Sequence, residues 1–226
     1  MKDRVKSFLV FATPGYRILG FGILPLLGLV MGHLVTVLFE VPGYMVTVFL
    51  LIPVEVMLDF MVFGGICAKD VSHLEYLKGS LRGEEVIKNA LVGGMVRTLL
   101  VLGGVLVGNQ ISFKILFPMR QMETGVGLNG IKLYLSAYVV ILATVMVGRF
   151  FDSININYML AMVAEAAEIM VASAMEEIFS RSLPACRVMV MILLSLFAVG
   201  LSILSVKIVL KKVKESYYDK TVADGD

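Results

Sequence analysis

Four carboxylates lie inside long apolar stretches of this sequence, where ionisable side chains are costly and are candidates for function. Glu55 and Asp59 are four residues apart, and Glu165 and Glu168 are three residues apart. On a helix, each pair therefore shares one face. The functional interpretation is an acidic, partly hydrated cavity between the two helices, which accepts cationic groups of a substrate or carries protons.

The alternative interpretation of these acids is structural. They would pair with Arg97 or Arg149, or stay protonated in hydrogen bonds between helices. Arg97 lies just inside an apolar stretch, so it is the candidate charge partner at membrane depth. Both interpretations require helices that hold these side chains within the bilayer.

The apolar content of the chain is too high for an ordinary soluble domain. Hydrophobic residues make up 58% of the 226 residues and charged residues 17%, and the mean hydropathy is +0.90. Soluble domains have about 45–50% apolar and about 25% charged residues. We therefore exclude a soluble enzyme and a nucleic-acid-binding module. The two cysteines, Cys67 and Cys186, also exclude a disulfide framework.

The apolar residues fall into six stretches, each long enough to cross about 30 Å of hydrocarbon as a helix. The sequence therefore predicts an all-α membrane protein with six transmembrane helices. They fall at about residues 18–39, 44–68, 91–113, 133–150, 158–179 and 187–210. Lysine and arginine gather before the first stretch, between the second and third, and after the sixth. This bias predicts that both termini are cytoplasmic.

The sequence predicts a separate role for each segment outside the spans. Residues 1–16 combine basic residues with an apolar patch and predict an amphipathic helix in the membrane interface, separated by Pro14 from the first span. Residues 17–210 would form the transmembrane domain, and residues 211–226 a cytoplasmic tail that is frayed from Ser216 to Asp226. Residues 176–186, interrupted by Pro184, predict a short outer segment before the last span.

The longest cytoplasmic loop, residues 69–90, predicts a short amphipathic helix that turns back into the third span. Ser80 suits an N-cap, and Glu84 and Glu85 suit the first turn. Glu84 and Lys88 have the spacing of an ion pair within a helix. The apolar side of this helix would consist of Leu81, Val86, Ile87 and Ala90.

Two patterns bear on packing and on catalysis. Gly28 with Gly32 and Gly104 with Gly108 form GxxxG spacings, which allow close helix packing within the chain or across a dimer. No motif for a nucleophile, a metal site or a phosphate-binding loop occurs. Six spans leave no room for a nucleotide-binding domain, so we expect neither an enzyme nor a cofactor in this chain.

The order of these elements resembles the permease subunit of an ABC-2 type transporter. Within that family, the small size is similar to that of bacterial peptide exporters, including those for phenol-soluble modulins. The resemblance implies a protein of the bacterial plasma membrane that exports amphipathic peptides or lipid-like substrates. It also implies a separate cytoplasmic ATPase that holds ATP and magnesium, and a second permease, identical or a sister subunit.

The resemblance also assigns roles to particular residues. The helix in the 69–90 loop would be the coupling helix that docks on the ATPase. Its contact residues would be Leu81, Arg82, Glu84, Glu85 and Lys88. The substrate pathway does not come from the resemblance: its candidate residues, Glu55, Asp59, Glu165 and Glu168 with Arg97 as a possible charge partner, follow from their position inside the apolar stretches.

Two other classes of function stay open from the sequence. One is a secondary transporter that works alone and couples transport to protons or ions, although no inverted repeat supports it. The other is a membrane scaffold or immunity protein, in which the buried acids serve packing only. An ATPase gene beside this one would favour the exporter.

Overall fold

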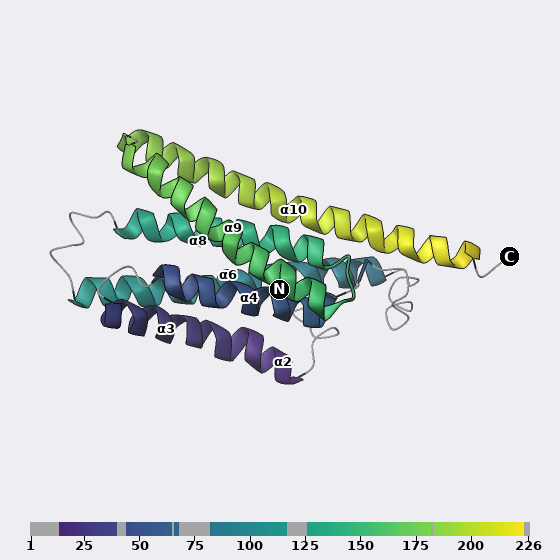
Figure 1. Cartoon of the computed structure of the whole chain (residues 1–226). Helices are drawn as coiled ribbons and strands as arrows, with labels where there is room; N and C mark the ends of the chain where they lie inside the picture. The colour runs from purple at the N-terminus through teal and green to yellow at the C-terminus, as the bar shows by residue number, and fades with distance from the viewer. Residues whose placement is uncertain are drawn as a thin grey trace.

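The structure, a computed structural model, describes residues 14–39, 44–64, 66–67, 82–116, 126–181 and 183–223. Every regular element in these ranges is helical, as the sequence predicts. The elements are α2 (Pro14–Ile18), the π-helical turn η1 (Leu19–Ile23), α3 (Leu24–Phe39), α4 (Tyr44–Phe63), α6 (Gly83–Leu116), α8 (Val126–Gly148), α9 (Ile154–Arg181) and α10 (Pro184–Ala223). They lie side by side as an elongated bundle (Figure 1).

Five segments of the described chain are long and apolar enough to cross a membrane. They are Pro14–Val35, Gly83–Ser112, Gly130–Gly148, Ile154–Arg181 and Ala185–Glu215. By length and composition, these five helices indicate a multi-pass membrane protein, and the described residues form helices without any strand. The first turn of α2 and the last turns of α10 lie at the same end of the bundle, which we call the terminal end (Figure 1).

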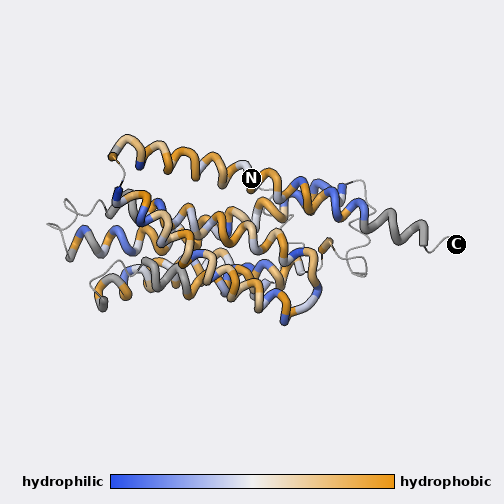
Figure 2. The backbone as a smooth tube through the Cα atoms, turned by 45° about the horizontal axis from the view of Figure 1, so that its top comes forward, coloured by the Kyte–Doolittle hydropathy of each residue, from blue (hydrophilic) through white to orange (hydrophobic). Residues whose placement is uncertain are grey.

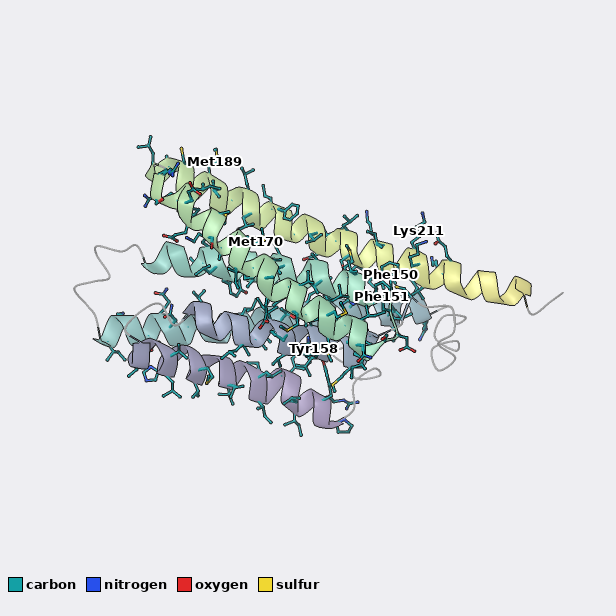
Figure 3. The ribbon with its side chains drawn as sticks, in the orientation of Figure 1. Phe150, Phe151, Tyr158, Met170, Met189 and Lys211 are labelled. Atoms are coloured by element: carbon teal, nitrogen blue, oxygen red, sulfur yellow. The ribbon has the colours of Figure 1, made fainter. Side chains whose placement is uncertain are left out.

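The spans differ in how deeply they are buried. About half of the α6 and α8 spans is buried, 50% and 56% respectively, against 22% for α9 and 17% for the α10 span. Met170 of α9 and Met189 of α10 are 73% and 57% exposed (Figure 3). Among these five spans, α6 and α8 are therefore the most deeply buried, and α9 and α10 present apolar side chains on the surface of the bundle.

Glycines bring α3 and α6 into close contact. A Cβ at Gly32 would lie 2.6 Å from the carbonyl oxygen of Val105, and one at Gly108 would lie 2.2 Å from that of Leu29. Gly28 and Gly104 are equally closely packed against the facing backbone. The two GxxxG patterns therefore face each other inside one chain, so this packing needs no dimer.

The first span begins earlier than the sequence predicts. Pro14 and Tyr16 belong to α2, which continues through η1 into α3, whereas the sequence placed both in the interfacial segment 1–16. Proline suits the first turn of a helix because its missing N–H group has no partner there in any case. The predicted interfacial helix over residues 1–13 lies outside the described residues.

The ends of α9 and α10 also differ from prediction. α9 continues to Arg181 and α10 begins at Pro184, so residues 176–186 hold the end of one long helix and the start of the next. Pro184 begins a helix here and does not interrupt a separate outer segment. α10 also continues to Ala223, through most of the predicted frayed tail.

The predicted separate helix before the third span is instead the beginning of α6. Residues 83–90 form its first turns, and the helix continues without a break to Leu116. No proline lies in this segment, and the interior position of Gly93 and Gly94 is tolerated within a packed helix. Leu81 and the loop before it lie outside the described residues.

Candidate functional site

Glu55 and Arg97 form an ion pair inside the bundle. The Arg97 Nη2 atom lies 3.0 Å from Oε2 of Glu55, and the two side chains are 1% and 0% exposed. Thr98 donates a second hydrogen bond to the same oxygen over 2.7 Å. Because α4 supplies the acid and α6 supplies both donors, this contact ties these two helices together.

Tyr16 completes the first cluster from α2. Its hydroxyl accepts a hydrogen bond from Arg97 and donates one to the carbonyl oxygen of Leu58 over 2.6 Å. Gly20, in the π-helical turn, gives the arginine room, since a Cβ there would lie 3.0 Å from Arg97 Cδ. The sequence offered no signal for Tyr16, because Pro14–Gly15 was interpreted as a break.

Asp59 and Arg149 form a second buried pair, one helical turn farther along α4. Arg149 donates from Nε and Nη2 to the two carboxylate oxygens over 2.9 Å and 2.7 Å. The guanidinium also lies over the Phe63 ring, 5.1 Å from its centre. Two parallel hydrogen bonds fix orientation as well as charge, so Arg149 holds the end of α8 against α4.

A third pair lies toward the opposite end of the bundle. Lys132 of α8 is fully buried, with its Nζ atom 2.5 Å from Oε2 of Glu176 on α9. The ammonium group is also 4.9 Å from the centre of the Phe179 ring. Glu176 is 57% exposed, so the pair opens onto the surface. Lys132 stands directly before the fourth predicted span, which begins at residue 133, so the sequence offered no signal of this contact.

The two acids near the middle of α9, Glu165 and Glu168, have no cationic partner among the described residues. Glu168 is 1% exposed, and its Oε1 lies 2.7 Å from Ser136 Oγ of α8, while Oε2 has no partner. Glu165 is partly exposed and makes no hydrogen bond or ion pair within the described chain. Within the described residues, Glu55, Asp59 and Glu168 therefore have three different polar partners, Arg97, Arg149 and Ser136, and Glu165 has none.

A groove of about 390 Å³ lies elsewhere, between α8 and α10. It is lined almost entirely by apolar side chains, with Ser195 as the one hydroxyl. Its other lining residues are Ile131, Val188, Met191, Ile192, Leu196 and Val199. None of the four predicted acids lines this groove.

The polar coupling residues occupy the first turns of α6. Arg82, Glu84, Glu85 and Lys88 are exposed, whereas Ile87 and Ala90 are buried. The amphipathic pattern predicted for this segment is thus present. Leu81 falls outside the described residues.

The end of α10 packs beside these turns. Glu84 pairs with Lys214 of α10 over 2.7 Å, where the sequence predicted a pair with Lys88. Val209 and Val213 of α10 belong to the same buried cluster as Ile87. We call residues 82–90 of α6 together with residues 207–215 of α10 the polar stub. In Figure 2, apolar colouring along α10 gives way to hydrophilic colouring in its part of the stub.

No group of three potential metal ligands occurs in the described part of the chain. No family model matches the chain, and no curated protein or solved structure is detectably similar to it. Any assignment of function therefore depends on the ion pairs, the polar stub and the exposed apolar faces.

Proposed function

We propose that this chain is the membrane-spanning subunit of an ATP-driven exporter of the ABC-2 type, and that a separate cytoplasmic ATPase docks on the polar stub. The single observation that carries the proposal is the construction of the stub. Its exposed charged residues belong to two helical segments that pack together, the first turns of α6 and the end of α10. Such a platform transmits force better than a loose loop.

Helix length favours a stub that stands outside the bilayer. α6 has 34 residues and α10 has 40. At 1.5 Å per residue they are about 50 Å and about 60 Å long, against about 30 Å of hydrocarbon. Both helices must therefore extend into water or headgroups, and the polar residues at the terminal end are the part suited to do so.

The unbroken course of α6 supports coupling from the stub into the membrane. Glu84 and Arg97 lie on the same helix, thirteen residues apart, and Arg97 binds Glu55 of α4. A displacement of the stub therefore moves the buried pair with it. In this proposal, closure of the ATPases rearranges α4 against α6 and opens the substrate path.

The proposed topology has six spans. They are the five apolar segments described above and α4, which lies second in chain order. Its 20 residues suffice to cross the hydrocarbon, and its two acids are neutralised by arginines. The lysines and arginines near the terminal end then face the cytoplasm of a bacterial cell.

The proposed substrates are amphipathic peptides or lipid-like molecules. The exposed apolar faces of α9 and α10, with methionines such as Met159, Met162 and Met170, suit contact with varied hydrophobic groups. These faces also offer a surface to a second permease, which the proposal requires as a copy or a sister subunit. Glu165 is the partly exposed acid on this side.

Charge reversal on the stub tests the docking. Glu84→Lys with Glu85→Lys should release the ATPase from the purified particle and lower its ATP hydrolysis, because the exposed acids and the Lys214 contact are lost. Glu177→Lys is the matched control, since Glu177 is an equally accessible acid at the opposite end. Retention of the ATPase by the stub variant would overturn the docking role.

A further inference from the structure

Glu168 differs from the other deeply buried acids of the described chain. Glu55 and Asp59 each accept hydrogen bonds from an arginine. Glu168 is equally buried, lies at the middle of α9 and has no cation within bonding distance in the described chain. It is about 20 Å from either end of that helix. An uncompensated carboxylate at this depth is costly.

Three serines in the bundle make the same pair of contacts. Ser112 donates to the carbonyl of Gly108 and lies 2.6 Å from His33 Nδ1. Ser202 donates to the carbonyl of Ala198 and lies 2.9 Å from the Tyr138 hydroxyl. A serine has one hydroxyl proton, so both contacts are satisfied together when the second partner supplies a proton of its own. Imidazole and phenol are both able to do so.

Ser136 is the third of these serines, and its second partner is a carboxyl group. Its Oγ lies 3.0 Å from the carbonyl oxygen of Leu133 and 2.7 Å from Glu168 Oε1. A carbonyl and an ionised carboxylate only accept hydrogen bonds, so one hydroxyl proton cannot satisfy both. Thr98 likewise lies between the carbonyl of Gly94 and Glu55, but Arg97 supplies that carboxylate with a cation, which Glu168 lacks among the described residues. With a proton on Glu168, the acid donates to Ser136, which donates to Leu133.

We propose that Glu168 and Ser136 form a proton-binding site at the centre of the bundle, in which Glu168 is held as the neutral acid. The bound ligand is a proton on the carboxyl group, and its hydrogen bond to Ser136 joins α9 to α8. This site is independent of the ATPase docking proposed above.

The neighbouring titratable groups are engaged elsewhere. On α8, Lys132 binds Glu176, Tyr134 donates to the carbonyl of Leu99, and Tyr138 lies against Ser202. On α4, the described acids are both paired with arginines, as given above. On α9 itself, Glu165 is partly exposed, one turn away. No cation is therefore placed to replace the proton.

Packing around the site explains how the proton would be retained and released. Ala161, Ala164 and Ala172 lie on the same stripe of α9 as Glu168 and are almost fully buried. This close seam keeps water from the carboxyl group. Loss of the proton to water requires α8 and α9 to separate, so protonation stabilises the closed seam.

Infrared spectroscopy of the purified full-length protein at neutral pH tests the site. The wild type should show the C=O stretching band of a protonated carboxylic acid. Glu168→Gln should remove that band, since its amide can still donate to Ser136 and preserve the packing. Glu165→Gln, the matched control on the same helix, should keep it.

Two results would overturn the site: a wild-type spectrum without that band, or a band that Glu168→Gln leaves unchanged. If Glu168→Gln does not fold, the band can be tested in the wild type by isotopic labelling of the glutamate carboxyl groups. The band must then shift, and an unshifted band refutes the assignment. Ser136→Ala should also move the band, because the acid loses its acceptor.

Discussion

Arg97 and Arg149 give Glu55 and Asp59 cationic partners inside the bundle. Each arginine donates to its carboxylate from a buried position, and each also lies over an aromatic ring. A buried pair of this kind gains little net stability over an apolar pair, but loss of one partner leaves an uncompensated charge. The pairs therefore fix which faces of α4, α6 and α8 meet.

Removal of Arg97 alone should destabilise the protein strongly. Arg97→Met leaves Glu55 buried without a cationic partner and should lower the free energy of unfolding by about 3–5 kcal/mol. The double variant Glu55→Leu with Arg97→Met removes both charges and should recover most of that loss. Thermal unfolding in detergent measures both variants, and a double variant no more stable than Arg97→Met would contradict the pairing.

The spacing of the acids predicts much of this chemistry but not the partners. The i,i+4 interval puts Glu55 and Asp59 on one face, and pairing with Arg97 or Arg149 was the structural alternative; the structure has both pairs. Which arginine meets which acid depends on the order of helices in space. Ser136 has no distinguishing neighbour in the sequence, so its contact with Glu168 could not be predicted.

At the level of helices, the α3–α6 contact depends on glycine. A Cβ atom at any of the four glycines would lie too close to the backbone of the facing helix, which is less able to shift than a side chain. These glycines are Gly28, Gly32, Gly104 and Gly108. The GxxxG spacing predicts close packing, but it does not distinguish a contact within the chain from a dimer. That distinction needs the three-dimensional order of the helices.

Alanine substitutions on α6 should separate packing from helix propensity. Gly108→Ala places a methyl group against Leu29 and should cost about 1–3 kcal/mol of stability. Gly103→Ala is the matched control, because a Cβ there meets nothing within 4 Å. It should be neutral or stabilise the helix by up to about 1 kcal/mol. Equal melting temperatures for the two variants would contradict this contact.

Helix boundaries were the weaker part of the sequence prediction. Pro14 and Pro184 were interpreted as breaks, yet each stands in the first turn of a long helix. Pro53 was predicted inside a span, and α4 continues through it. A proline marks a helix start or an interruption depending on its neighbours in space, which hydropathy alone does not supply.

At the scale of the whole molecule, the proposed orientation can be checked with the two native cysteines. Cys186, near the start of α10, is exposed, and Cys67 is buried. With the terminal end in the cytoplasm, a membrane-impermeant maleimide should label Cys186 on intact cells. Lys211, near the other end of α10, is also exposed (Figure 3).

Lys211→Cys in a Cys186→Ser background is the matching variant. It should react only after the cells are opened, because the polar stub faces the cytoplasm. Cys186→Ser alone controls for any reaction at Cys67. Labelling of Lys211→Cys, but not of Cys186, on intact cells would mean that the topology is the reverse of the proposed one. The polar stub would then lie on the side of the membrane opposite to the ATPase.

The subunit composition of the native particle shows whether this chain works together with an ATPase. The complex would be purified from native membranes through a tag on this chain, and its subunits identified and counted by mass spectrometry. The account predicts two permease chains together with a cytoplasmic ATPase. A particle that contains this chain without any ATPase, yet transports substrate, would contradict it.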